Sequence, residues 1–185
     1  IIRRYKTKEI GMCGIVGYYG EKSPKEVIME GLKALEYRGY DSAGVAIFDH
    51  GEVKRVRAEG KLVNLEVLLK NTSFDGHTGI GHTRWATHGV PSERNAHPHT
   101  VDGVSIVHNG IIENYIEIKN QLAKEGVKFS SDTDSELVAH LISREVKITK
   151  NLLKAVFNIL PKLHGAFSIV TLWQETPDEI VDYKN

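Results

Sequence analysis

Residues 13–20 read CGIVGYYG and place the chain's single cysteine, Cys13, at the start of a short apolar run. A run of this length that ends in glycine is typical of a buried β-strand. A cysteine on such a strand is most often a small packing residue. Met12 gives a second interpretation: if it is the initiator and is removed, Cys13 becomes the first residue and carries a free α-amine. The pKa of such an amine is about 7.7–8.0, so it can serve as a base for the adjacent thiol.

The composition is that of an ordinary globular domain. The chain has 185 residues, 41% hydrophobic and 26% charged, which allows one domain with a real core. Lys plus Arg (24) equals Asp plus Glu (24), so no overall field favours nucleic acid or an anionic membrane as partner. No apolar run approaches the ~20 residues of a membrane span. One cysteine excludes an internal disulfide and suits a reducing compartment, so we expect a cytoplasmic protein.

Apolar runs predict β-strands that come in pairs. The expected strands span residues 13–19, 43–48, 53–58, 78–84, 104–108, 166–173 and 179–183. The sequence Asp49-His50-Gly51 between the second and third strands is a hairpin signal. Helices are expected between the pairs, so the order differs from the regular β-α-β alternation of a parallel sheet. Two stacked antiparallel sheets covered by helices fit this pattern, and so does a two-layer α+β fold.

Capping signals place the expected helices. Ser23 as N-cap, Pro24 at the first position and Glu26 as capping-box partner predict a helix that ends at Gly39. A second capping box, Thr133 to Glu136, starts another helix. The remaining helices are expected over residues 62–69, 112–124 and 151–160.

A long polar segment from Trp85 to Gly103 is expected to be a loop, and loops of this length in compact domains are usually functional or disordered. Its first residues belong to the motif HTRWATHG, residues 82–89, where several donor side chains gather at a strand end. The plainer interpretation is an exposed strand end. We favour binding, because the planar fork of Arg84 matches a carboxylate and His88 adds a donor beside it.

Two further motifs supply groups that a thiol nucleophile needs. His108-Asn109-Gly110 is commonly a turn, but an Asn amide and a Gly N–H at a strand end also suit an oxyanion hole, whose donors are worth ~2.7–4 kcal/mol each. The segment 131–136, SDTDSE, is by itself a helix start rich in caps and acids. Within it, Asp134 is a candidate acceptor for a substrate ammonium group.

Histidine clustering supports a competing interpretation, a metal-binding domain. Five of the nine histidines fall between residues 82 and 108, and His97-Pro98-His99 contains two of them. The chain has no second cysteine and no HExxH pattern, and Pro98 makes the pair rigid and divergent. We therefore expect no metal and no other cofactor.

The order of the motifs resembles that of the glutaminase domain of class II, N-terminal-nucleophile, glutamine amidotransferases; they are CGIVG, YRGYDSAG, HTRWATHG, HNGIIENY and SDTDSE. Within the class, HTRWATHG, NAHPH and HNGIIENY are similar to the glutamine–fructose-6-phosphate aminotransferase branch, which forms amino sugars. The resemblance covers residues 13–185. It implies an α+β fold, a four-layer αββα sandwich of two antiparallel sheets. It also implies hydrolysis of the glutamine side-chain amide, through an acyl-enzyme, to glutamate and ammonia.

The resemblance assigns catalytic roles to three residues. Cys13 is the nucleophile, with its own α-amine as base. Asn109 and Gly110 form the oxyanion hole. Arg38, in the YRGYDSAG motif, lies near the nucleophile with a less defined role.

The resemblance also assigns the glutamine-binding residues. Arg84 holds the α-carboxylate, with Thr87 and His88 beside it, and Asp134 holds the α-ammonium. Trp85 lies where the family gates the passage of ammonia to a second site. A zwitterionic substrate needs a cation and an anion placed apart, which agrees with this assignment.

Residues 1–12 are expected to be an extension from an upstream start site or from cloning, rather than a propeptide. While they remain attached, Cys13 has an amide in place of its base, and the alternative function is a glutamine-binding module without turnover. The family's domain continues for several strands beyond residue 185, so the domain over 13–185 is expected to be truncated, with an unpaired sheet edge. The resemblance implies the sugar-isomerase domains of the same enzyme as partners, and a homo-oligomer in the full-length form.

Overall fold

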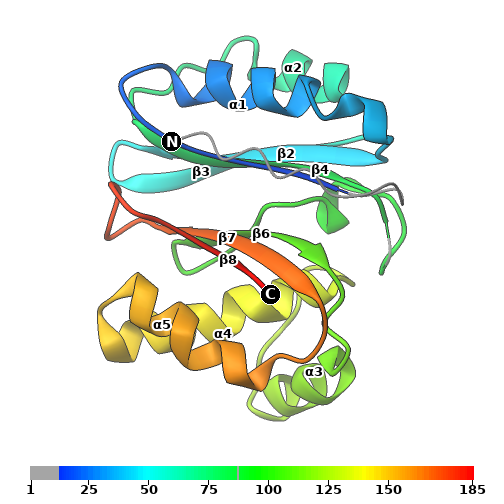
Figure 1. Cartoon of the computed structure of the whole chain (residues 1–185), viewed down its shortest axis with the longest axis vertical. Coiled ribbons are helices and arrows are strands. Elements are labelled where there is room, and N and C mark those ends of the chain that lie inside the picture. The colour runs from blue at the N-terminus through cyan, green and yellow to red at the C-terminus, as the bar shows by residue number, and fades with distance from the viewer. Residues whose placement is uncertain (1–12, 87) are drawn as a thin grey trace.

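The computed structural model describes residues 13–86 and 88–185. Two four-stranded antiparallel sheets stack face to face, and helices cover both outer faces (Figure 1). This is the four-layer αββα arrangement that the resemblance implied, and the two-layer alternative is wrong. In the described part of the chain, none of the helices has the length and apolar character needed to cross a membrane.

The first sheet comes from the N-terminal half of the chain and has the order β1-β4-β2-β3. Its strands are β1 (Gly14–Tyr19), β2 (Ser42–Asp49), β3 (Glu52–Glu59) and β4 (Thr78–Arg84). The predicted hairpin joins β2 and β3, and its turn residues His50 and Gly51 have φ values of 50° and 87°. Two positive φ values in succession match the twist of the flanking strands. Helices α1 (Pro24–Lys33) and α2 (Leu62–Leu69) cover this sheet.

The second sheet comes from the C-terminal half and has the order β5-β6-β7-β8. Its strands are β5 (His99–Val101), β6 (Val104–Gly110), β7 (Phe167–Trp173) and β8 (Ile180–Lys184). Helices α4 (Asp134–Thr149) and α5 (Leu152–Ile159) cover its outer face, and α3 (Tyr115–Lys124) packs beside α4.

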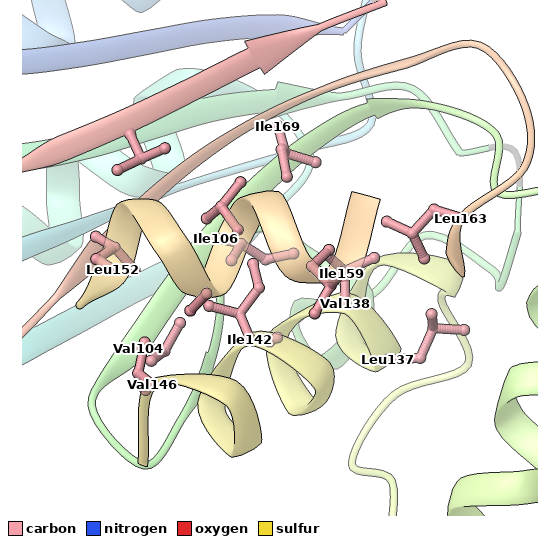
Figure 2. Close-up of a cluster of buried hydrophobic side chains, with 14 of the residues drawn as sticks. Val104, Ile106, Leu137, Val138, Ile142, Val146, Leu152, Ile159, Leu163 and Ile169 are labelled. Atoms are coloured by element: carbon pink, nitrogen blue, oxygen red, sulfur yellow. The ribbon is translucent and has the colours of Figure 1, made fainter. Parts of the chain in front are cut away.

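Each sheet has an apolar core against its helices. The larger core lies between the second sheet and α4 and α5; Figure 2 shows members such as Ile106, Leu137, Ile142, Ile159 and Ile169. In α4 the core residues Val138, Ile142 and Val146 recur every four positions, on one helical face, which explains why this segment is a helix. A smaller cluster, Ala46, Ile80, Val107 and Leu172, lies between the two sheets.

A glycine in β4 lets α1 approach the first sheet closely. A Cβ on Gly81 would lie 2.3 Å from Ile28 Cγ2 of α1, so a larger residue would push the helix away. Ile28 and Leu32 are fully buried at this contact. Helix α1 therefore packs at short range directly against β4, the strand that ends at Arg84.

Several predicted boundaries are wrong. Helix α1 ends at Lys33, and a separate 3₁₀ turn over Glu36–Arg38 precedes Gly39, whose φ of 72° needs glycine. Helix α3 begins at Tyr115 instead of residue 112. The segment 85–103, expected to be a loop throughout, contains a short 3₁₀ turn (Glu93–Asn95) and the strand β5.

The capping boxes hold in position but not in hydrogen bonding. Ser23 and Thr133 are N-caps, yet neither side chain makes the capping hydrogen bond. The Glu136 carboxylate instead accepts hydrogen bonds from the backbone and hydroxyl groups of Ser130 and Ser131. This carboxylate therefore ties the chain ahead of α4 to the helix.

Candidate active site

Cys13 lies directly before β1, where the start of that strand pairs with the end of β4. The Trp85 N–H donates a hydrogen bond to Cys13 Sγ at 3.1 Å. The Asn109 Nδ2 group, at the end of β6, donates to the Cys13 carbonyl oxygen at 3.0 Å. The nucleophile candidate is thus held by both sheets, which brings together residues 96 positions apart in the sequence.

Burial raises the pKa of the Cys13 thiol above its ordinary value, and the Trp85 N–H and the Arg84 guanidinium only partly oppose this effect. The Asp41 carboxylate raises the same pKa further. The thiol is therefore protonated at neutral pH, and it needs a base before it can attack a carbon.

Arg84 ends β4 and is buried, with 3% of its surface exposed. Its Nη2 group donates to the carbonyl oxygens of His88 and Gly89. Its Nη1 group lies 3.8 Å from Asp41 Oδ1 and makes no hydrogen bond to any described residue. The guanidinium therefore fixes the loop that follows β4 with one nitrogen, and the other nitrogen faces the Asp41 carboxylate.

The remaining predicted residues of this loop differ in their surroundings. The His88 ring packs edge-on against Tyr115, with ring centroids 4.7 Å apart. Trp85 is half exposed and its ring lies over Gly39, where a Cβ would be 3.0 Å from the ring. Thr87 lies outside the described residues.

Arg38 stacks on its neighbour Tyr37, with the guanidinium carbon 5.6 Å from the ring centroid. Its Nε group also donates to the Tyr37 hydroxyl at 3.3 Å. Neither contact tests whether Arg38 acts near Cys13, which stays a prediction.

Asn109 and Gly110 end β6 beside Cys13. Gly110 has a φ of 128°, and a Cβ there would lie 2.3 Å from the Ala166 carbonyl oxygen. Only glycine fits such a position. Asn109, whose amide donates to the Cys13 carbonyl oxygen, is therefore followed by a residue that has no side chain of its own.

Asp134 is the first residue of α4 and is 3% exposed. Its Oδ2 accepts a hydrogen bond from the Ile112 N–H at 3.0 Å, and its Oδ1 accepts one from Ser135 Oγ at 3.4 Å. The nearest ring nitrogen, His108 Nδ1, is 3.8 Å from Oδ1. Burial lowers the pKa of His108, although the Asp134 carboxylate partly opposes this effect, so the imidazole beside Asp134 is neutral at neutral pH.

Four buried histidines, His82, His97, His99 and His108, form a cluster in which the other three rings surround His97, and His108 lies beside Asp134. Burial lowers the pKa of His82 to about 3 and lowers those of the other three as well. Ser135 Oγ bonds both His97 Nε2 (2.6 Å) and His108 Nδ1 (2.8 Å). His99 Nε2 bonds Thr133 Oγ1 at 3.0 Å.

These contacts bear on the competing metal-site interpretation. His97 and His99 bond the hydroxyl groups of different residues instead of converging on one point. No group of three or more His, Cys, Asp or Glu in the described residues is arranged to hold a metal ion. The sequence interpretation missed that these histidines contact the start of α4, although the alternation of Asn95, His97 and His99 was a signal of a one-sided extended segment.

Comparison with known proteins decides the family. Residues 82–182 match the model of a family described as "Glutamine amidotransferase domain". The chain is a glutamine amidotransferase domain. It is 55% identical over 174 residues to the isomerizing glutamine–fructose-6-phosphate aminotransferase of Mesorhizobium japonicum. The aligned residues make up 94% of this chain and 29% of that relative. The enzyme of the same name from Acinetobacter baylyi is 50% identical, over 92% of this chain and 28% of that relative.

The domain spans less than a third of the length of these relatives. Among solved structures, it is similar to a glutamine phosphoribosylpyrophosphate amidotransferase from B. subtilis in complex with ADP and GMP, with a TM-score of 0.72 and 28% identity. That match covers 88% of this chain and 35% of the other. The N-terminal-nucleophile sandwich that the resemblance implied is thus confirmed as the fold.

Proposed function

We propose that the domain hydrolyses the side-chain amide of glutamine with Cys13 as nucleophile. The observation that carries the proposal is that the Trp85 N–H donates to the Cys13 thiol while the Asn109 amide donates to the Cys13 carbonyl oxygen, in a chain of the amidotransferase family. The raised pKa of the thiol supports the need for a base, and a free α-amine on Cys13 is the base that the proposal supplies. Family membership and the named relatives favour turnover over a binding-only module.

The proposed reaction has two steps. The α-amine takes the thiol proton, and Sγ attacks the amide carbon, while Asn109 Nδ2 and the Gly110 N–H stabilise the oxyanion. The C–N bond then breaks, the proton passes from the α-ammonium to the leaving nitrogen, and ammonia and a thioester result. Water, with the α-amine again as base, hydrolyses the thioester to glutamate and restores the thiol.

The α-carbon of glutamine carries a carboxylate and an ammonium group. The proposal assigns each of these groups to a residue on a different element. Arg84 Nη1, which makes no hydrogen bond to a described residue, would bind the carboxylate, with Thr87 and His88 beside it. Asp134, which makes no hydrogen bond to a cation among the described residues, would bind the ammonium group. Trp85, half exposed next to the thiol, would cover the path by which ammonia leaves.

The relatives point to the larger reaction. Their printed name, glutamine–fructose-6-phosphate aminotransferase, supports a role for this domain as the ammonia source of an amino-sugar-forming enzyme. Sugar-isomerase domains of the same enzyme would then receive the ammonia. A homo-oligomeric full-length enzyme in the cytoplasm completes the proposal, with L-glutamine as the substrate of this part.

The test compares three preparations: a chain that starts at Cys13, the same chain with Cys13→Ala, and the chain with residues 1–12 attached. Release of glutamate and ammonia from glutamine is measured in each. We expect activity only in the first, because the second lacks the thiol and the third lacks the free α-amine. Glutamine hydrolysis by the Cys13→Ala chain would contradict the proposal.

A further inference from the structure

The segment 95–99, NAHPH, has no role in the chemistry above, although its polar side chains are buried. Asn95, His97 and His99 are 0%, 4% and 1% exposed, and they alternate along the chain. Each is hydrogen-bonded to the segment 131–136 that carries Asp134. The three bonds are Asp132 N to Asn95 Oδ1 (2.9 Å), His97 Nε2 with Ser135 Oγ (2.6 Å) and His99 Nε2 with Thr133 Oγ1 (3.0 Å).

The same segment is fixed to the first sheet. Arg57 Nη1, on β3, donates to the carbonyl oxygens of Arg94 and Ala96 at 3.1 and 3.0 Å. The His97 carbonyl lies over β2, where a Cβ on Gly44 would be only 2.3 Å away. Residues 95–99 therefore connect the first sheet to the start of α4 without freedom to shift toward either.

Asn95 adds a third connection, to the loop that Arg84 holds. Its Nδ2 group donates to the Val90 carbonyl oxygen at 2.9 Å and lies 3.4 Å from Asp132 Oδ2. A Cβ on Gly89, whose φ is 76°, would lie 2.7 Å from this nitrogen. One buried amide thus joins the loop after Arg84 to the segment before Asp134.

We propose that Asn95 is a positioning residue that fixes the separation between Arg84 and Asp134, and thereby determines selectivity for an α-amino acid. This inference rests on the proposed function, in which those two residues bind the carboxylate and the ammonium group of glutamine. Asn95 itself is fully buried and acts through residues 88–90 on one side and 132–134 on the other. A substrate with both charges needs the correct separation, whereas one with the carboxylate alone does not.

The experiment measures binding, so it does not depend on turnover. Calorimetric titrations of the 185-residue chain use glutamine and glutaramate, which has the same amide and carboxylate but no α-amine. We expect the unsubstituted chain to prefer glutamine by about 10- to 100-fold, the range of a buried charge-assisted pair. Asn95→Ala should reduce this preference to within about threefold, mainly by weakening glutamine binding.

A matched control separates positioning from simple loss of stability. Asn151 is the N-cap of α5, and its side chain accepts a hydrogen bond from Lys154 N at 2.8 Å. Asn151→Ala should lower the melting temperature and keep the preference for glutamine. Asn95→Ala should change the preference in the temperature range where circular dichroism shows both variants to be folded.

A second variant guards against an Asn95→Ala protein that does not fold. Gly89→Ala disturbs the same junction from the loop side and should also reduce the preference. Full preference for glutamine in a folded variant at either position overturns the positioning role and leaves the proposed function intact. An unsubstituted chain that binds neither ligand, or both equally, overturns the proposed substrate contacts and this inference together.

Discussion

Two of the regions that hold the sheets of this domain together do so by different means. At one, Ile80 of β4 packs against Val107 and Leu172 of the second sheet in a fully apolar contact. At the other, buried polar side chains of the segment 95–99 are hydrogen-bonded to the start of α4, and Arg57 of the first sheet donates to the carbonyl oxygen of Ala96 in that segment. The polar region also includes His82, whose ring contacts that of His97. Ile80 and His82 are two residues apart on β4, so the change from apolar to polar contacts occurs within one strand.

The two kinds of contact contribute differently to the fold. Apolar burial contributes free energy in proportion to area and tolerates small shifts. Hydrogen bonds between buried groups are directional, and each unsatisfied group is destabilising, so they define positions closely. The polar region lies beside Arg84 and Asp134, where the proposed substrate contacts need defined positions.

The largest effect on stability should come from the apolar region. Ile80 is fully buried, and Ile80→Ala removes side-chain volume that the surrounding strands cannot refill completely. We expect the free energy of unfolding to fall by about 2–5 kcal/mol, with glutamine affinity in the folded protein nearly unchanged. Urea titration measures the first quantity and calorimetry the second. Val67→Ala, at an exposed apolar position of α2, is the control, and its effect should be within about 0.5 kcal/mol.

A smaller loss of stability, combined with weaker binding, should mark the polar region. Ser135→Ala leaves the bonded ring nitrogens of His97 and His108 without this partner, and it removes one hydrogen bond to Asp134. We expect about 1–3 kcal/mol less stability and weaker glutamine binding. Ser143→Ala is the control, because Ser143 is buried on the same helix but bonds only Asp102 by its side chain in the described structure. If both variants bind glutamine equally well, the polar region has no influence on the site.

The smallest effect near neutral pH should be a change in the pH dependence of stability. His82 is fully buried and burial lowers its pKa to about 3, whereas the unfolded side chain has a pKa of about 6.5. Between these values the unfolded chain binds a proton that the folded chain does not, so stability falls as the pH falls from about 6.5 to about 3. His82 contributes about 1 kcal/mol per pH unit in this window.

The variant His82→Asn should reduce that slope by about 1 kcal/mol per pH unit between pH 6 and 5. Urea unfolding at closely spaced pH values gives the slope directly. His77→Asn, at an exposed position before β4, is the matched substitution. Equal slopes for the His82→Asn and unsubstituted chains are the result that would refute a neutral, buried His82.

Local sequence patterns predicted much of the fold. The bounds of α2 and β4 agree with the structure residue by residue, because apolar periodicity and flanking polar residues decide such segments. Strand β5 was missed because three residues, one of them a buried histidine, carry no apolar pattern. Its conformation depends on pairing with β6, which only the tertiary structure provides.

The site shows the same division. The residue types of Cys13, Arg84, Asn109 and Asp134 pointed to the chemistry, since each side chain suits one part of a zwitterionic amide. The contact between Asn109 and the Cys13 carbonyl oxygen was beyond sequence reasoning, because it depends on how the two sheets are placed against each other. The same holds for the carbonyl partners of Arg84, which depend on the path of the loop after β4.

The partly buried thiol of Cys13 also affects how fast this protein is oxidised. Peroxide and other oxidants react with the thiolate far faster than with the protonated thiol. Because burial raises the pKa of Cys13, the resting domain presents oxidants with a slow target. Deprotonation by an α-amine would make the sulfur reactive toward glutamine and toward peroxide alike. Chemical durability and catalytic competence therefore depend, in opposite directions, on the same proton.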